Sequence, residues 1–295
     1  MVAGETSSGS LSDALPSIIA DARIVKEFQG TWMRTTDIRR QKPGTGLSWQ
    51  EFALSQVAAQ DITEATNNQN FQQLQGTLFS IEPTMSQIII KITDRTFRKI
   101  AAVVTGKFGS LAGNAMARKD DEDYLATFST FATTTSPGAG NPLSFGHIAA
   151  AKSNVTSNVT EPSMAEVFAV LHGFQIKDIQ DEVLSGVGTY TIPEGLTQDT
   201  FRQGFAGTVA GANVFEDGNI TIDGSDDANG ACHSREGVVA AVGMEIKKET
   251  DRDINFGGGA DVISMVSEIA FAERKSGTTQ VWAYLLKSDA TAPTS

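Results

Sequence analysis

The stretch from Thr93 to Phe131 contains no proline and carries apolar residues along one helical face. These residues recur at three- and four-residue intervals: Phe97, Ile100, Ala101, Val104, Phe108, Leu111, Ala112, Ala115 and Met116. Thr93 or Asp94 can cap the start, because a short side-chain oxygen accepts a hydrogen bond from a free first-turn N–H. A helix that continues to Thr130 would be roughly 55 Å long, which predicts a strut in a flat subunit. A bend or break is expected near three glycines, each costing about 1 kcal/mol relative to alanine: Gly106, Gly109 and Gly113.

A polar, glutamine-rich segment precedes this helix and predicts a long hairpin. Ser48–Ala53 and Gln72–Ser80 are strand-like, and they flank the polar centre Glu64–Asn70. Their apolar anchors are too few for the hairpin to fold alone, so it needs another surface to lie on. The β-branched run that follows predicts a strand at Gln87–Thr93.

The rest of the chain predicts a second region inserted before a return to the first. Ser144 can cap a short helix from Phe145 to about Ser153. The second region opens with a buried strand, Ala165–Leu171, and a helix from about Phe174 to Val183. Further expected strands are Thr189–Ile192, Val209–Phe215 and Val238–Met244, the last of which starts the return. Ala260–Ala272 and Thr279–Leu286 are expected to pair as an antiparallel hairpin turning at Ser276-Gly277. Before all of these, Met1–Ser12 predicts a loosely held arm, and Leu15–Gln29 can contain a short helix.

Composition places the chain among ordinary folded proteins of one or two domains. It has 295 residues, of which 40% are hydrophobic and 20% charged. The single Cys232 cannot form an internal disulfide, which favours a reducing compartment. The first twenty residues lack the pattern of a secretory signal, and no stretch is long enough to cross a bilayer. We therefore expect no membrane partner.

The formal net charge of −12 argues against wrapping nucleic acid, because phosphate binding requires clustered Lys and Arg. One local basic cluster does occur, at Arg34, Arg39, Arg40 and Lys42. We interpret it as a solvated loop or a patch that meets an acidic neighbour, with nucleic-acid contact as the weaker alternative.

No residue pattern predicts catalysis, a cofactor or a metal site. His147, His172 and His233 lie outside any ligand-spaced motif, and Cys232-His233 are sequence neighbours whose side chains rarely face each other. The glycine-rich runs 204–211 and 257–259 lack the lysine of a phosphate loop and the spacing of a dinucleotide fingerprint. Four aspartates form an acidic loop that misses the spacing of a calcium loop: Asp217, Asp223, Asp226 and Asp227. We therefore expect a protein that is not an enzyme.

The order of these parts resembles the major capsid proteins of tailed bacteriophages, the Hong Kong 97-type fold. Phe79–Pro83 through Ile88–Thr93 looks like the strand that leads from the family's extended loop into its spine helix. Leu111-Ala112 to Tyr124-Leu125 looks like the end of that helix. Other segments resemble the opening strand and helix of the family's axial domain, its glycine-centred strand and the return into the peripheral domain: Ala165–Ile179, Val209–Val214 and Arg235–Asp253.

The resemblance implies an α+β fold with four parts. These would be an N-terminal arm (1–34), an extended hairpin loop (35–80), a peripheral domain with a long spine helix (81–160 and 238–295) and an inserted axial domain (161–237). It implies a structural shell subunit that self-assembles into hexamers and pentamers of an icosahedral head. The head would enclose double-stranded DNA without sequence-specific binding, as part of a virion assembled in the host cytoplasm. A separate scaffolding protein and a portal are the other implied partners.

Extended elements that cannot bury their apolar anchors within one subunit gain stability by lying across neighbours. Our inter-subunit contact candidates are Trp49, Phe52, Phe71, Arg39 and Arg40. Three alternatives stay open. They are an encapsulin-like nanocompartment shell with the same fold, a soluble enzyme with a scattered active site, and a tail or decoration protein.

Overall fold

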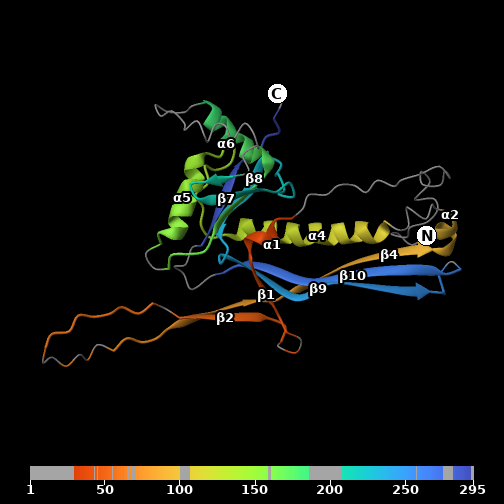
Figure 1. Ribbon diagram of the computed structural model, residues 1–295, viewed down its shortest axis with the longest axis horizontal. Helices are drawn as coiled ribbons and strands as arrows, with labels where there is room; N and C mark the ends of the chain where they lie inside the picture. The colour runs from red at the N-terminus through yellow and green to blue at the C-terminus, as the bar shows by residue number, and fades with distance from the viewer. Residues whose placement is uncertain are drawn as a thin grey trace.

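The computed structural model describes residues 30–42, 44, 46–54, 56–64, 67, 69, 71–99, 107–158, 161–185, 207–256, 258–274 and 282–293. The expected arm and helix before Gly30, the strand Thr189–Ile192 and the turn Ser276-Gly277 lie outside the described residues. Within them the chain forms a mixed helix and sheet structure with three sheets. Figure 1 shows an elongated molecule, with a long sheet and helix, a compact upper part and a projecting hairpin.

A long, narrow sheet of four strands runs along the molecule. Its strand order is β1-β9-β10-β4, with β1 parallel to β9 and the other pairs antiparallel. The bounds are Asp37–Arg40 for β1, Val238–Asp253 for β9, Ala260–Glu273 for β10 and Thr84–Thr93 for β4. The expected strands at Gln87–Thr93, Val238–Met244 and Ala260–Ala272 are thus observed, and β9 is much longer than the sequence predicted.

Helix α4 (Phe108–Ala126) lies along this sheet (Figure 1). Ala112 and Met116 pack with Met265 of β10 and with the isoleucines of β4, and the buried stripe continues every four residues to Phe128. The single helix expected from Thr93 to Thr130 is described as shorter pieces. These are α2 (Asp94–Lys99), α4 and a 3-10 helix (Thr127–Thr130), while residues 100–106 lie outside the described part. The 19 residues of α4 span about 28 Å, roughly half of the expected length.

The compact part is built on a five-stranded sheet with the order β11-β8-β5-β7-β6. Its strands are β11 (Ala283–Asp289), β8 (Asp227–Ser234), β5 (Val167–Leu171), β7 (Ala212–Glu216) and β6 (Thr208–Val209). Every residue of β5 is buried. Helices α5 (Phe145–Thr156) and α6 (Gly173–Ser185) cover one face with Ile148, Val155 and Ile179. The other face packs on Trp32 and on the end of α4.

Several local predictions for this part are confirmed. Strand β5, helix α6 and helix α5 lie where the sequence placed them. Ser144 precedes α5, and the His147 ring nitrogen Nδ1 accepts a hydrogen bond from the Ser144 N–H at 3.2 Å. The expected strand Val209–Phe215 is split into β6 and β7 by a tight turn, in which Ala210 and Gly211 have φ of 50° and 85°.

The expected closing hairpin of Ala260–Ala272 with Thr279–Leu286 is wrong. β10 pairs with β9 and β4, whereas β11 pairs with β8 from Ala283 opposite His233 to Asp289 opposite Asp227. Ala283 and Leu286 are fully buried in the five-stranded sheet, a partner that adjacency in sequence could not reveal. Both α5 and β11 therefore pack with the five-stranded sheet, although the expected domain boundaries grouped them with the four-stranded one.

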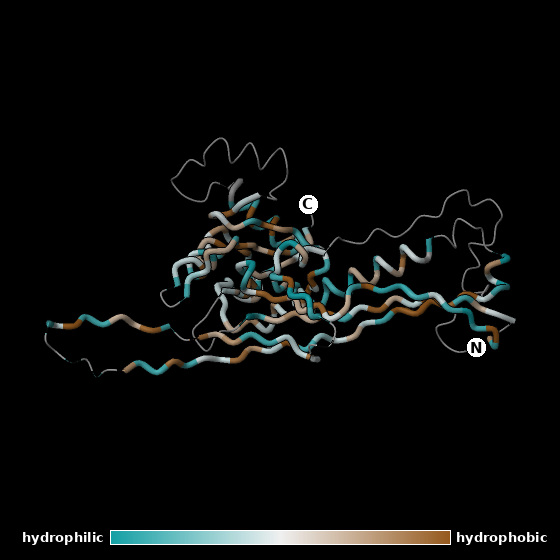
Figure 2. The backbone as a smooth tube through the Cα atoms, turned by 60° about the horizontal axis from the view of Figure 1, so that its bottom comes forward, coloured by the Kyte–Doolittle hydropathy of each residue, from teal (hydrophilic) through white to brown (hydrophobic). Residues whose placement is uncertain are grey.

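A two-stranded sheet forms the base of the projecting hairpin. Strand β2 (Trp49–Leu54) pairs antiparallel with β3 (Gly76–Ile81), so the expected pairing of the two strand-like pieces is observed. Figures 1 and 2 show both arms of the hairpin running beyond the rest of the molecule. Helix α1 (Trp32–Thr35) precedes this hairpin and β1. None of the helices in the described residues has the length and apolarity to cross a membrane.

Candidate assembly surface

The two faces of the β2–β3 hairpin differ in what covers them. Trp49 and Phe79 face inward, with ring centroids 6.2 Å apart, and pack on a small cluster around Ile81. Phe52 and Leu78 lie opposite each other in the strand register and face outward. Because side chains alternate along a strand, the inner face is covered by the chain itself and the outer face is not.

The outer face of the hairpin, together with its projecting arms, carries exposed apolar side chains. We call this set the hairpin surface: Leu47, Phe52, Leu54, Val57, Ile62, Phe71, Leu74 and Leu78. Each is more than half exposed, and Phe71 is 90% exposed. Brown, hydrophobic stretches along both arms are visible in Figure 2. Large exposed apolar side chains that gather on one part of a molecule are typical of a binding surface, so the hairpin surface is our candidate for contact with another molecule.

The glutamine-rich arms are held together by side-chain amides. The Ala58 N–H donates to Gln72 Oε1 at 2.9 Å, and Gln72 Nε2 donates back to the Ala58 carbonyl. A glutamine side chain therefore takes the place of a backbone partner beyond the end of the β2–β3 ladder. This contact joins the two arms at one point, between Ala58 and Gln72.

Phe52 lies directly against Gly76. A Cβ atom on Gly76 would be 2.3 Å from Phe52 Cζ and 2.8 Å from the Ala53 carbonyl oxygen. Only glycine leaves room for the ring at this position. The position of Phe52 is therefore set by the opposite strand, even though the residue is 60% exposed.

Arg274 fixes the base of the hairpin to the body. Its Nε donates to Glu51 of β2 at 3.0 Å, Nη2 to Asp37 of β1 at 2.7 Å and Nη1 to the Glu236 carbonyl at 2.8 Å. The Arg274 side chain is only 9% exposed. Burial acts to raise the pKa of Asp37, but hydrogen bonds from Arg274 and then Arg39 outweigh it and lower that pKa.

The five predicted contact residues fall into different environments. Phe52 and Phe71 lie on the hairpin surface, whereas Trp49 is half-buried on the inner face. Arg39 donates to Asp37 from Nε at 3.0 Å and from Nη2 at 2.8 Å, and Arg40 donates to Glu245 at 2.8 Å. Both arginines thus form ion pairs with carboxylates of their own chain, and these pairs neutralise the arginine charges locally.

Arg40 also borders a hollow of about 320 Å³ between α1, α4 and the four-stranded sheet. Its wall is mostly apolar and includes Trp32, Ile38 and Val242, with Asp120 of α4 as a further member. Burial, followed by repulsion from Asp123, raises the pKa of Asp120 to about 6. The rim of this hollow thus carries the Arg40–Glu245 ion pair.

The histidines and the cysteine have local structural partners. Cys232 and His233 are neighbours in β8 and point to opposite faces: Cys232 packs with α5 and α6, and His233 lies beside Tyr124. Burial raises the pKa of Cys232 to about 12 and lowers the pKa of His233 to about 4. Burial also lowers the pKa of His172, whose Nδ1 accepts from the Phe174 N–H. In the described residues no group of three His, Cys, Asp or Glu is arranged to hold a metal.

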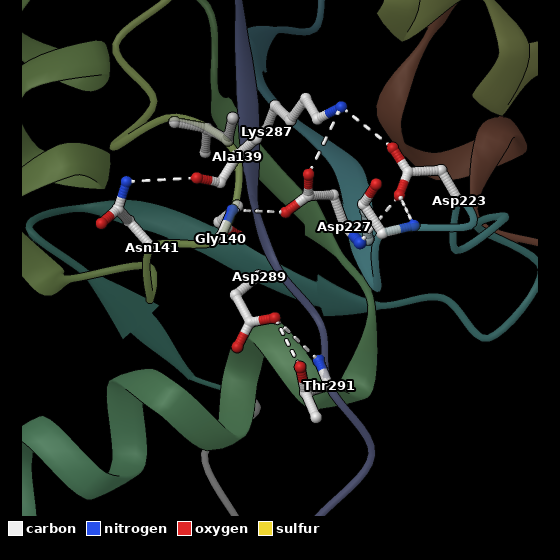
Figure 3. Close-up of polar contacts among 12 residues, drawn as sticks. Ala139, Gly140, Asn141, Asp223, Asp227, Lys287, Asp289 and Thr291 are labelled. Carbon is white, nitrogen blue, oxygen red and sulfur yellow. Dashed lines mark hydrogen bonds and ion pairs between the residues drawn. The ribbon is translucent and has the colours of Figure 1, made fainter.

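The predicted acidic loop is closed by a lysine. Figure 3 shows Lys287 of β11 between Asp223 and Asp227, at 3.0 Å and 3.5 Å from their carboxylates. Asp223 Oδ1 also accepts from the Ser225 and Asp227 N–H groups, and Asp227 Oδ1 accepts from Gly140 at 2.7 Å. The hydrogen bond from Lys287 is the largest cause of the lowered pKa of Asp223. These carboxylates therefore organise a turn.

Sequence reasoning missed two buried acids on α4 and their partner. Asp120 and Asp121 are buried, and so is Asp217, which the sequence placed in an acidic loop. A signal was present, because Asp120 continues the four-residue stripe that runs from Ala112 through Met116 to Tyr124. A carboxylate in an apolar stripe indicates a buried polar contact.

Comparisons with known proteins were made for the sequence and for the structure. No protein-family model matches the chain, and no curated protein matches its sequence. Solved structures do match. The capsid of the cyanophage P-SCSP1u is 12% identical with a TM-score of 0.68, covering 97% of this chain and 96% of that one. An acid-stable capsid of the Helicobacter pylori bacteriophage KHP30 is 11% identical with a TM-score of 0.66, covering 91% and 93%.

A third similar structure is the capsid of a native GTA particle, at 12% identity and a TM-score of 0.64. It covers 97% of this chain and 99% of that one. These alignments span almost the whole of each chain, so they include the long sheet, the compact part and the hairpin together. The chain therefore has the fold found in these capsid structures.

Proposed function

We propose that this chain is a structural shell subunit, the major capsid protein of a tailed bacteriophage with the Hong Kong 97-type fold. Copies would self-assemble into hexamers and pentamers of an icosahedral head that encloses double-stranded DNA. The observation that carries the proposal is the full-length similarity to capsid structures combined with an apolar hairpin surface that its own chain leaves uncovered. Capsid subunits are built to bury such surfaces against other copies.

Each part of the chain has a role in this proposal. The β2–β3 hairpin is the extended loop, α4 is the spine helix of the peripheral domain, and the five-stranded sheet is the core of the inserted axial domain. The pairing of β11 with β8 requires one change in the expected boundaries, since residues 283–289 then belong with the axial sheet. Residues 1–34 would be the N-terminal arm.

The hairpin surface supplies the energy for contacts between copies. Full burial of a large apolar side chain contributes about 1.5–3 kcal/mol, and the hairpin surface offers several such side chains per copy. Phe52, Leu78 and Phe71 are the proposed centre of this contact, because aromatic residues dominate many interfaces. Arg39 and Arg40 would act at its edge, where paired charges set register more than affinity.

The acidic net charge of −12 accords with packaging DNA without sequence-specific contacts. Scaffolding and portal proteins would be separate partners in assembly within the host, and the finished chain would reside in the virion. No catalytic role is part of the proposal.

The test is assembly of the purified full chain, with its scaffolding protein where one is needed, followed by negative-stain electron microscopy. We expect closed shells for the wild type and for Phe52→Leu, which keeps an apolar side chain. We expect Phe52→Asp to remain as free, folded subunits, since a charge cannot be buried in the contact without a large cost. Shells from Phe52→Asp, or a wild type that stays a stable small oligomer under all assembly conditions, would contradict the proposal.

A further inference from the structure

Two carboxyl groups from distant parts of the chain meet in the interior. Asp121 lies on α4 and Asp217 follows β7, and both are fully buried. Thr31 contacts both groups: its N–H donates to Asp121 Oδ1 and its hydroxyl donates to Asp217 Oδ2, each at 2.9 Å. Asn219 does the same from the other side, with Nδ2 donating to Asp121 Oδ2 at 2.9 Å and its N–H to Asp217 Oδ1 at 3.0 Å.

Burial and a neighbouring acid oppose the charged form of Asp217 more than these donors favour it. Thr31 and Asn219 each hydrogen-bond to both carboxyl groups, which holds Asp121 and Asp217 side by side. Like charges that share a buried site cannot both ionise at ordinary pH. Burial and, after the opposing hydrogen bond from Asn219, the neighbouring Asp121 raise the pKa of Asp217 to about 7.

The groups that face the pair do not neutralise it. Tyr124, one helical turn along α4, bonds Thr35 Oγ1 at 2.8 Å and His233 Nε2 at 2.7 Å. Burial raises the pKa of Tyr124 and lowers that of His233, so both are uncharged near pH 7. Among the described residues, no recorded hydrogen bond or ion pair joins a lysine or arginine to either carboxyl of the pair.

The other charged side chains of these elements are engaged elsewhere. On α4, Lys119 pairs with Asp123, Arg118 pairs with Glu122 at 3.3 Å, and Asp120 lines the hollow beside Trp32. Beyond β7, Asp223 pairs with Lys287, and Glu216 lies near His172. On α1, Arg34 is exposed.

The backbone at Gly30, just before α1, lies against the Asp121 carboxyl. A Cβ atom placed on Gly30 would be 2.4 Å from Asp121 Oδ1, so only glycine permits this approach. Two residues later, Trp32 is buried edge-on against Phe271, with ring centroids 5.4 Å apart. The segment Gly30–Thr36 is thus held by the carboxyl pair, by the Thr35–Tyr124 contact and by Trp32.

We propose that Asp217 keeps its proton beside Asp121 and that the two residues act as a pH-dependent latch, which holds Gly30–Thr36 against α4 and the β7–β8 connection. With the proton in place the four hydrogen bonds from Thr31 and Asn219 are all made. Loss of the proton leaves two adjacent buried charges, and the segment is released from them toward water. This latch concerns the chain itself and does not depend on the proposed capsid function.

The sign of the pH effect follows from the raised pKa. In the unfolded or released state Asp217 ionises near its ordinary pKa of about 3.9. The stabilisation by the latch is therefore fully present below that pH and is lost as pH rises through about 7. His233, with its lowered pKa, has the opposite effect on stability. It is buried in its neutral form, so its contribution to the stability of the folded protein is lost as pH falls from about 6.5 toward 4. The comparison of variants, rather than the overall pH profile, isolates the latch.

Hydrogen–deuterium exchange of the full-length chain tests the latch directly. After correction for intrinsic exchange rates, we expect exchange within residues 30–36 to rise roughly tenfold from about pH 6 to pH 8, because one proton is lost across a pKa near 7. Asp217→Asn should abolish this rise. Asp226→Asn is the matched control: it removes an exposed acid from the same connection, at a φ of 60° that asparagine tolerates, and should keep the wild-type response.

An equal pH response in the wild type and in Asp217→Asn would overturn the proposal, as would no response in the wild type. Infrared difference spectroscopy gives a second readout that does not require substitution of Asp217, and Asp120→Asn is used because the pKa of Asp120 is also raised, to about 6. A protonated-carboxyl band that disappears between about pH 6 and pH 8 in Asp120→Asn supports a proton on Asp217, and its absence at both pH values refutes it.

Discussion

Strand β5 and the outer face of the hairpin carry similar residues in opposite environments. All five residues of β5, Val167–Leu171, are buried between α5 and α6 on one side and the end of α4 on the other. On the hairpin, Phe52, Leu54 and Leu78 are equally apolar, yet each is more than half exposed. The comparison shows that an apolar sequence alone does not ensure burial. Apolar side chains are buried within one chain only where that chain also supplies a surface to pack against.

The two regions also differ in what holds them. β5 is central in a five-stranded sheet and is stabilised by packing on both faces. The hairpin is a two-stranded sheet, which is marginal in water, and is fixed at its base by the polar contacts of Arg274 and by the packing of Trp49 and Phe79 around Ile81. Its remaining stabilisation is therefore expected to come from another copy.

The largest expected effect is the difference in unfolding free energy between truncating a side chain in β5 and truncating one on the hairpin surface. Leu171→Ala in β5 should destabilise the free subunit by about 2–5 kcal/mol, because it opens a cavity in a packed core. Phe52→Ala should change the same free energy of unfolding by less than about 0.5 kcal/mol, because its ring is already exposed. Urea unfolding of unassembled subunits measures both. Equal losses of unfolding free energy in the two variants would show that Phe52 is packed in the free subunit as tightly as Leu171, which would contradict the comparison.

An intermediate effect is expected at the base of the hairpin. Arg274→Met removes the donor shared by Asp37 and Glu51, and leaves their carboxylates partly buried without it. We expect a loss of about 2–3 kcal/mol, below the range for a fully buried pair because Glu51 is partly open to water. Hydrogen exchange in β2 should increase together with this loss. Arg39→Met, which removes a half-exposed partner of the same Asp37, is the control and should cost under about 1 kcal/mol.

The smallest effect concerns the position of Phe52 itself. Gly76→Ala would place a Cβ within 2.3 Å of the Phe52 ring and push the ring from its place. We expect a loss of about 1 kcal/mol in the free subunit and a several-fold rise in the concentration needed for assembly. Gly207→Ala, where nothing lies within 4 Å, should alter neither quantity. An unchanged assembly threshold for Gly76→Ala would show that the position of this ring is irrelevant to contact.

Local signals in the sequence predicted much of the fold. Strand-like composition located β2 and β3, a continuous apolar run located β5, and the cap at Ser144 located the start of α5. Partner choice between distant segments was not predictable, and for this reason β11 was paired with β10 instead of β8. The apolar side chains of both β8 and β10 satisfy the pattern of such a partner, so only tertiary packing distinguishes them.

The candidate site residues, like the elements of the fold, could be predicted only where the signal was local in the sequence. Phe52 and Phe71 could be named because a polar hairpin with isolated aromatic residues is unusual in a self-contained fold. Trp49 was named for the same reason, but strand alternation turns it toward Phe79. The pairing of Asp121 with Asp217 could not be predicted, because it joins residues 96 positions apart through contacts to Thr31 and Asn219.

Thiol labelling of the assembled chain tests the central claim, that the hairpin surface is buried between copies. The only native cysteine, Cys232, is fully buried, so Phe52→Cys introduces a single accessible thiol. The account predicts rapid reaction with a maleimide in free subunits and at least tenfold slower reaction in assembled particles, in which contact excludes the reagent. Equal labelling rates in the two states would contradict it.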